Sequence, residues 1–152
     1  MSSTTLGLRL GLPITATALP LFASYFSLLS YRVISLRVSS ETFVGDKSKE
    51  GKCSQDNPDP LTIAARAHGN FAEYVPLALT VTALAELSGG DHKILTGALG
   101  ALFVLRVGHV ELGVRGKSAL GPGRIIGFLG TLGYLLGMSG YAAWLNRGYW
   151  GY

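Results

Sequence analysis

Apolar residues gather in four long runs that are separated by polar segments. A helix needs about 20 mostly apolar residues to cross the hydrocarbon core of a bilayer, and each run is about that long. The fourth run carries no charged residue, whereas a helix of a soluble bundle would carry a polar stripe. The pattern predicts an all-α, integral membrane four-helix bundle that forms one domain over residues 1–152. The expected helices are 10–36, 61–87, 94–114 and 125–145.

The segments between these runs differ in length and charge. The first, 37–60, is long and polar; the second, 88–93, is a tight turn around two glycines; the third, 115–124, is short and basic. Positive residues mark the cytoplasmic side, so we expect the first and third loops in the cytoplasm and both termini opposite. The basic residues expected on the cytoplasmic side are Arg32, Arg37, Lys47, Lys49, Lys52, Arg115, Lys117 and Arg124. Those expected on the opposite side are Arg9, Lys93 and Arg147. The aromatic residues Trp144, Tyr149, Trp150 and Tyr152 near the C-terminus suit an aromatic belt at that opposite interface.

Composition agrees with a membrane protein. Apolar residues make up 48% of the chain and charged residues 14%, against about 25% charged in soluble proteins. The formal charge of +4 has no interleaved aromatic pattern, so we expect no nucleic-acid partner. The single cysteine, Cys53, excludes an intrachain disulfide. The first apolar run is longer than the core of a signal peptide, about 7–15 residues, and is therefore expected to span the membrane.

Residues 66–76, RAHGNFAEYVP, place charges inside the second apolar run. A charge at the centre of a spanning helix costs about 2.5–3.5 kcal/mol and usually faces a partner or a wet cavity. Arg66, Asn70 and Glu73 follow the spacing i, i+4, i+7 and share a helix face. The third run adds Arg106 and His109 on one face, so Arg106 is expected against Glu73, with Glu111 pointing elsewhere.

Two interpretations of this polar set remain open. It could be an ion-pair network that fixes the register of the helices. It could also line an anion-binding pocket, because topology brings Arg37, Arg66, Arg106 and Arg124 toward the same membrane face. A metal site is not indicated, since His68 and His109 lack the third and fourth ligands that zinc normally takes.

Glycines recur along one side of the fourth run at steps of three and four residues. Such a stripe is typical of close packing between membrane helices, and we expect it to serve packing rather than chemistry. Its members are Gly123, Gly127, Gly130, Gly133, Gly137 and Gly140.

The chain resembles the membrane-associated proteins in eicosanoid and glutathione metabolism, the MAPEG family. The resemblance covers nearly the whole chain and rests on four expected spans, RAHGNFAEYVPL in the second, LRVGH in the third and GPGR before the fourth. The similarity is greatest to small microbial and fungal members. It implies a homotrimer with glutathione, as co-substrate, between neighbouring subunits near the cytoplasmic side. Arg37, Arg66, Asn70, Glu73 and Arg106 would bind glutathione, and Arg124 would stabilise its thiolate.

The resemblance further implies a transferase or peroxidase in which the thiolate attacks a lipophilic electrophile arriving from the bilayer. The chain departs from family members that carry a serine after the arginine of the fourth helix and tyrosines nearby, since it has Ile125, Gly113 and Phe128 there. A non-catalytic lipid-binding or scaffold protein of the same family is the alternative; a transporter is not indicated, because no repeat with interrupted helices is visible. The expected membrane is the endoplasmic reticulum in a eukaryote or the inner membrane in a bacterium.

Overall fold

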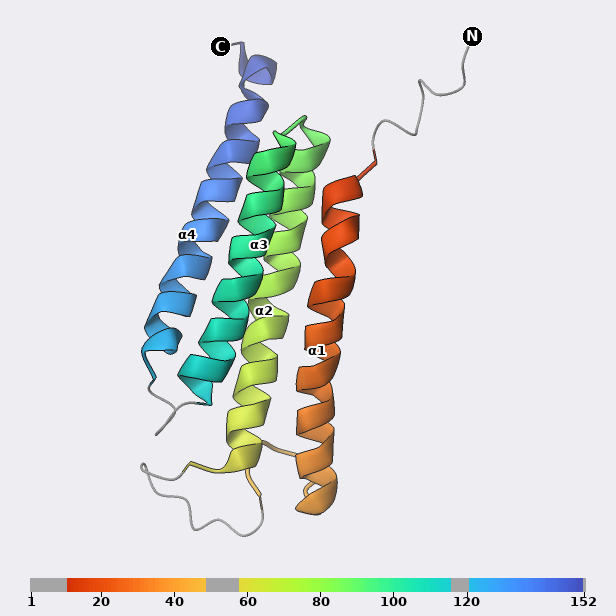
Figure 1. The fold of residues 1–152 in the computed structure, drawn as a ribbon, viewed down its shortest axis with the longest axis vertical. Coiled ribbons are helices and arrows are strands. Elements are labelled where there is room, and N and C mark those ends of the chain that lie inside the picture. The colour runs from red at the N-terminus through yellow and green to blue at the C-terminus, as the bar shows by residue number, and fades with distance from the viewer. Residues whose placement is uncertain (1–10, 49–57, 116–120, 152) are drawn as a thin grey trace.

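The described part of the chain forms four long helices, which run side by side in a single bundle (Figure 1). The computed structural model describes residues 11–48, 58–115 and 121–151, and this part of the chain contains no strand. The all-α prediction is therefore confirmed. A π-helical turn, η2, continues α3, and a short 3-10 helix, η4, follows α4. The elements are α1 (Pro13–Ser39), α2 (Pro60–Leu87), α3 (His92–Gly108), η2 (His109–Val114), α4 (Pro122–Leu145) and η4 (Arg147–Trp150).

Proline and aspartate set where the helices begin. Pro13, Pro60 and Pro122 occupy first-turn positions, where proline costs no hydrogen bond. Asp59 caps α2 by accepting from the backbone N–H of Leu61 at 3.2 Å, and Asp91 caps α3 through Lys93 N–H at 2.8 Å. These signals place the α2 and α3 starts within one or two residues of the expected 61 and 94, and α1 begins at Pro13 rather than at residue 10.

α1 is held at its N-terminal end by a carboxylate from another helix. Glu86, in the last turn of α2, accepts hydrogen bonds from the backbone N–H groups of Ile14 at 2.7 Å and Thr15 at 2.9 Å. Its second oxygen also accepts from the Thr15 hydroxyl at 2.6 Å. The first N–H groups of a helix have no partners within the helix, so an acidic residue there satisfies them and complements the helix dipole.

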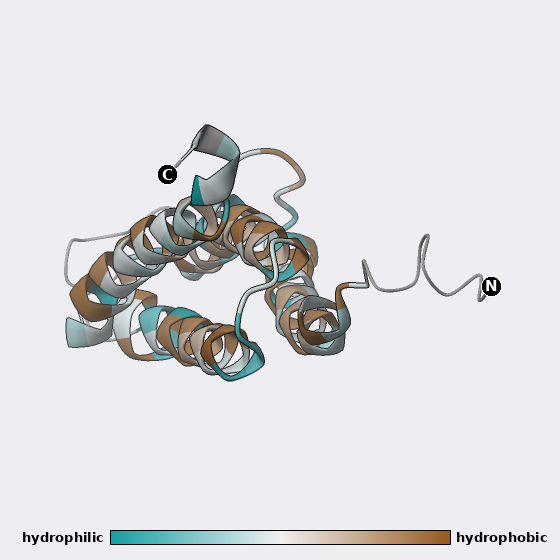
Figure 2. Cartoon of the chain, turned by 90° about the horizontal axis from the view of Figure 1, so that it is seen from above, coloured by the Kyte–Doolittle hydropathy of each residue, from teal (hydrophilic) through white to brown (hydrophobic). Residues whose placement is uncertain are grey.

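Three helices are long and apolar enough to cross a membrane: α1, α3 together with η2, and α4. α2 is as long as the others, with 28 residues, but does not meet the same criterion because Arg66, Asn70 and Glu73 interrupt its apolar sequence. Large apolar side chains also cover much of the outside. Leu136 is 77% exposed and Val104 69%, and Figure 2 shows hydrophobic stretches on the outward sides of the helices.

The interior is a thin layer of apolar side chains between the helices. Phe22 of α1 meets Phe103 of α3 edge to face at 5.4 Å between ring centroids and lies 6.5 Å from Phe71 of α2. These rings belong to the larger of two buried clusters. The smaller cluster joins Ala85, Leu95 and Met138 near the turn between α2 and α3.

The predicted glycine stripe divides into two halves. A Cβ at Gly123 would lie 2.6 Å from the Gly108 carbonyl oxygen, and one at Gly127 would lie 2.8 Å from that of Leu105, so these glycines let α4 pack closely on α3. Gly133, Gly137 and Gly140 have open space beside them. The packing role is thus observed for the first half of the stripe within one chain.

The helix ends that carry most of the predicted site residues lie at one end of the bundle. The C-terminal ends of α1 and η2 and the N-terminal ends of α2 and α4 lie at the same end of the bundle, while the α2–α3 turn and the C-terminus lie at the other (Figure 1). Several residues discussed above lie outside the described residues, or have side chains that do: Arg9, Lys49, Lys52, Cys53, Lys117, Trp150 and Tyr152.

Candidate anion-binding pocket between α2 and α4

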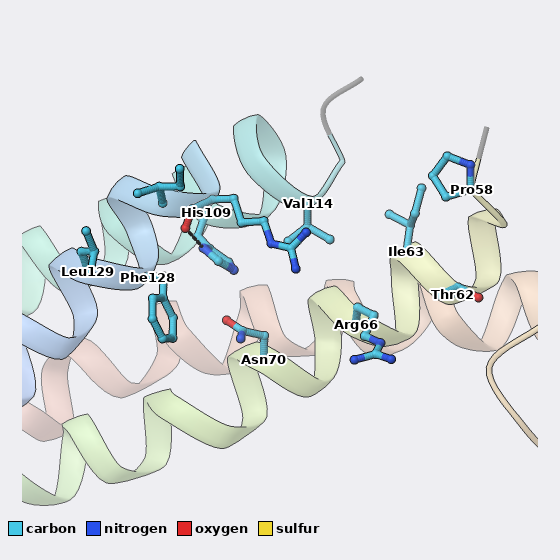
Figure 3. A pocket seen from close by; sticks show the side chains of 11 residues that line it. Pro58, Thr62, Ile63, Arg66, Asn70, His109, Val114, Phe128 and Leu129 are labelled. Atoms are coloured by element: carbon cyan, nitrogen blue, oxygen red, sulfur yellow. Dashed lines mark hydrogen bonds between the residues drawn. The ribbon is translucent and has the colours of Figure 1, made fainter. Parts of the chain in front are cut away.

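A cavity of about 620 Å³ opens between α2, η2 and the first turns of α4 (Figure 3). Its volume falls within the range of small-molecule sites, about 300–1,000 Å³. Its polar side chains come from all three elements, and the rest of its lining is apolar. The lining residues are Pro58, Thr62, Ile63, Arg66, Asn70, His109, Val114, Arg124, Ile125, Phe128 and Leu129.

Arg66 and Asn70 form the α2 wall of this pocket. They are one helical turn apart, so both side chains reach the same side of α2. Arg66 is exposed, whereas Asn70 is half-buried and its carbonyl oxygen accepts a hydrogen bond from Arg106 Nη1 at 2.9 Å. Figure 3 shows Asn70 pointing from α2 toward the His109 side of the cavity, with Arg66 further along the same helix. The two residues that the sequence places on one face do share the pocket.

Arg106 lies behind this wall and is among the most buried residues of the chain, at 1% exposure. Besides its bond to Asn70, its Nη2 donates to the Gly127 carbonyl at 3.1 Å, and its guanidinium lies 5.5 Å from the Tyr74 ring centroid. Its Nε has no hydrogen-bond partner. Within the described residues, no carboxylate pairs with it.

The expected contact between Arg106 and Glu73 is wrong. Glu73 is exposed on α2, one turn beyond Asn70, and the side of α2 that faces α3 and α4 carries Asn70 instead. Arg106 is therefore bound by a neutral amide and a backbone carbonyl rather than by a counter-ion. A buried guanidinium without a carboxylate leaves a positive potential beside the cavity.

Arg124 supplies the α4 wall in the first turn of that helix, two residues after Pro122. Its backbone carbonyl accepts a hydrogen bond from His109 Nδ1 at 3.0 Å, and its side chain lines the cavity. Gly113 makes this approach possible, because a Cβ there would lie 2.7 Å from Arg124 Cα. The backbone of α4 thus occupies the space that a larger side chain at position 113 would need.

The π-helical turn η2 is a feature that the sequence pattern did not predict. Its extra residue per turn changes which side chains face α4, and it brings His109, Gly113 and Val114 into the contact. Such turns occur frequently at functional sites. His109 belongs to the polar set but is not among the predicted binding residues. Its spacing of three residues from Arg106, which puts both on one helix face, is the sequence feature that could have indicated its place in the pocket.

Two predicted residues lie away from the cavity in the single chain. Arg37, in the last turn of α1, donates from Nη1 to the Phe43 carbonyl at 2.9 Å, and Glu73 is exposed on α2. Of the six predicted site residues, Arg66, Asn70 and Arg124 line the pocket, Arg106 supports it from behind, and Arg37 and Glu73 do not reach it.

A separate ion-pair cluster lies on the α1 side of η2. Glu111 pairs with Arg32 at 2.6 Å and with Arg115, and it accepts from the Tyr25 hydroxyl at 3.0 Å. This cluster is not the ion-pair network considered from the sequence, which would have joined Arg66, Glu73 and Arg106. Glu111 does point away from the pocket, as expected.

The remaining lining is apolar. Ile125 and Phe128 line the cavity from α4, and the Phe128 ring meets Tyr74 edge to face at 6.0 Å. Among the described residues, no group of three or more histidine, cysteine, aspartate or glutamate side chains could hold a metal ion.

Comparison with known proteins agrees with this architecture. The model of the MAPEG family matches residues 14–144, which covers the whole pocket and all but the first residue of α1 and the last residue of α4 among the four long helices. No match was found among curated proteins or among solved structures. The match over most of the chain, together with helices able to cross a membrane, identifies an integral membrane protein. The chain belongs to the MAPEG family, whose functions are in general those of glutathione-related membrane transferases, peroxidases and related proteins.

Proposed function

We propose that the pocket binds glutathione as its thiolate and presents the sulfur to a lipophilic electrophile from the bilayer. The reaction is then a membrane glutathione transfer or a glutathione-dependent peroxide reduction. In the transfer, the thiolate sulfur forms a bond to the electrophilic carbon, and the leaving group departs with the electrons of the bond that breaks. No covalent bond to the protein is needed, because positioning and charge stabilisation suffice.

The excess of positive charge around the cavity carries this proposal. Arg66 and Arg124 line opposite walls, Arg106 is buried behind Asn70, and no carboxylate is among the lining residues that the structure describes. A ligand with two carboxylates and a thiolate would supply the missing negative charge. Guanidinium groups bind carboxylates with paired, charge-assisted hydrogen bonds, which suits the two ends of a tripeptide.

The position of Arg124 fits the role of thiolate partner. A cysteine thiol has a pKa of about 8.5, and an adjacent guanidinium favours the charged form. Arg66 would bind a carboxylate, and Asn70 an amide through its NH₂ group, since its oxygen is occupied by Arg106. Arg106 would act by orienting Asn70 and by its charge.

Arg37 and Glu73 would complete the site from a neighbouring copy in a homotrimer. Arg66 and Glu73 are exposed on α2 although they lie within a helix of the membrane bundle. Exposure of such charges to lipid is costly, which favours their coverage by protein. We propose that the first and third loops face the cytoplasm, in the endoplasmic reticulum or the bacterial inner membrane.

The lipophilic substrate would approach from the α4 side. Ile125 and Leu129 line the cavity and are 66% and 59% exposed, so they connect the pocket to the outer, membrane-facing surface. An apolar electrophile dissolved in the bilayer could reach the sulfur along this surface, while glutathione enters from the aqueous side.

Activity of the purified, assembled protein tests the proposal. Glutathione should be conjugated to an aryl halide or oxidised by a lipid hydroperoxide, and Arg124→Ala should lower kcat/KM by about 100-fold, similar to the loss of one charge-stabilising group. Arg147→Ala is the matched control, because Arg147 stacks on Trp144 at the other end of α4. Absence of turnover with both substrate classes in an intact assembly contradicts the proposal.

A non-catalytic lipid-binding protein is the second candidate. Ile125 and Phe128 make the α4 side of the pocket apolar, and Gly113, which packs on the backbone of Arg124, adds no hydroxyl group. This candidate predicts that glutathione produces no thermal stabilisation, whereas any ligand of the native state must stabilise it. A lipid that raises the melting temperature in place of glutathione would favour it.

A further inference from the structure

His109 lies at the junction of α3, η2 and α4 and is 4% exposed. It is the first residue of η2, and its ring lines the pocket. The absent side chain of Gly127 makes room for it, because a Cβ at that position would lie 3.0 Å from His109 Cα. The imidazole is thus confined between two helices rather than mobile on a surface.

The hydrogen bond of the ring defines its tautomer. Nδ1 lies 3.0 Å from the carbonyl oxygen of Arg124, and a carbonyl can only accept, so Nδ1 must carry the proton. Nε2 of the neutral ring then carries a lone pair. Figure 3 shows the ring of His109 over the cavity, above Asn70, with one nitrogen bonded to the backbone. Within the described residues, Nε2 has no hydrogen-bond partner.

Nε2 is the basic atom of this pocket. The side chains of Arg66 and Arg124 offer only donors, and the oxygen of Asn70 already accepts from Arg106. The Thr62 hydroxyl donates to the Asp46 carbonyl at 2.5 Å. A ligand that must lose a proton in this cavity therefore meets one suitable nitrogen among the lining residues that the structure describes.

We propose that His109 Nε2 accepts the proton of the glutathione thiol, while the Arg124 guanidinium stabilises the resulting thiolate. This inference rests on the proposed function and adds a general base to it. The S–H bond breaks, its electron pair stays on sulfur, and the proton bonds to Nε2 to form an imidazolium. After the sulfur has reacted, the imidazolium returns the proton to solvent or to a departing alkoxide.

The charges around His109 link the loss of the thiol proton to its uptake by the imidazole. The titratable groups around His109 are Arg66 from α2 and Arg124 from α4, which line the same pocket, and Arg106 one turn earlier in α3. These cations would repel an imidazolium formed by itself, whereas the neutral ring offers the lone pair of Nε2. Proton transfer creates a thiolate at the same moment, and the attraction between the new charges offsets the repulsion.

The test measures thiolate formation directly, by rapid mixing of the assembled protein with glutathione and the ultraviolet absorbance of the thiolate. His109→Asn keeps an N–H group for the Arg124 carbonyl but has no basic nitrogen. We expect thiolate formation at neutral pH to slow by about 100-fold, within the range of general-base contributions. The wild-type rate should rise with pH as the imidazole loses its proton, and the variant should lack this step.

S-methylglutathione separates binding from proton transfer, because it has no thiol proton. It should bind wild type and His109→Asn equally, as measured by thermal stabilisation. His68→Asn is the matched control, since His68 stacks on Phe26 at 4.8 Å and does not line the pocket; it should leave the rate unchanged.

Each outcome separates the two proposals. If neither glutathione nor S-methylglutathione binds the wild type, the proposed function fails. If both bind, but thiolate forms equally fast in wild type and His109→Asn, the role of His109 alone is overturned. Should His109→Asn not assemble, His109→Gln replaces it, and a wild-type profile with no step in the imidazole range overturns the role without any variant.

Discussion

Arg106 Nη1 donates to Asn70 Oδ1 at 2.9 Å, and this bond joins a buried cation on α3 to the pocket wall on α2. The guanidinium of Arg106 is charged and the amide of Asn70 is neutral, so the pair leaves a net positive charge inside the bundle. A soluble core would rarely keep a guanidinium without a carboxylate. In this chain, the arrangement adds positive charge beside the cavity, which the proposed anionic ligand would balance.

Asn70→Asp should therefore make the protein more stable without ligand and less able to bind glutathione. The new carboxylate would pair with Arg106 and supply the charge that the ligand otherwise brings. We expect a higher melting temperature for the unliganded protein and a glutathione Kd raised about tenfold, or about 1.4 kcal/mol. Asn146→Asp is the control, because Asn146 bonds Ser88 at the far end. An unchanged Kd in Asn70→Asp would contradict this account of the pocket charge.

Gly113→Ala should destabilise the protein although alanine is the better helix former. Its Cβ would lie 2.7 Å from Arg124 Cα, so the start of α4 must move. Overpacking of this kind costs about 1–3 kcal/mol, and the displaced Arg124 should also lower activity. Gly97→Ala has open space and should be neutral or slightly stabilising. Thermal melting of both variants checks this, and equal melting temperatures would show that the contact at Gly113 is not tight.

Glu111→Gln should lower stability but leave glutathione binding intact. The variant loses the charge that joins Arg32 of α1 to the η2 turn, and partly exposed pairs of this kind contribute up to about 1 kcal/mol each. The cluster lies on the α1 side of η2, away from the pocket lining. Melting curves and glutathione titrations distinguish the two effects, with Glu41→Gln in the exposed turn after α1 as control. A large loss of affinity would mean that the two sides of η2 are coupled.

Asp59 should make stability depend on pH in acid. Burial tends to raise its pKa, but hydrogen bonds from the backbone N–H groups of Ser48 and Leu61 outweigh burial and hold the pKa below the ordinary value. The folded protein thus favours the carboxylate. The stabilisation is complete above the ordinary pKa of aspartate, about 3.9, and is lost as the pH falls through the lowered value. Asp59→Asn should reduce this part of the acid sensitivity; an unchanged melting profile against pH would exclude Asp59 as its source.

The sequence pattern predicts the helices and the side of the bundle on which the polar residues meet. Apolar runs, first-turn prolines and helix-capping aspartates define the elements, and spacing alone places Arg66 and Asn70 on one face. The partner of Arg106 could not be predicted, because it depends on how α3 is rotated against α2. The π-helical turn has no signature in hydrophobic periodicity, so the position of His109 over the pocket emerges only from the folded chain.

Calorimetric titration of the assembled wild-type protein with glutathione tests the central claim most directly. The account predicts saturable binding that is weakened in Arg66→Ala and in Arg124→Ala and is unchanged in Arg147→Ala, because only the first two arginines line the cavity. Binding that is equally strong in all three variants, or an assembled protein that takes up no glutathione, would contradict it.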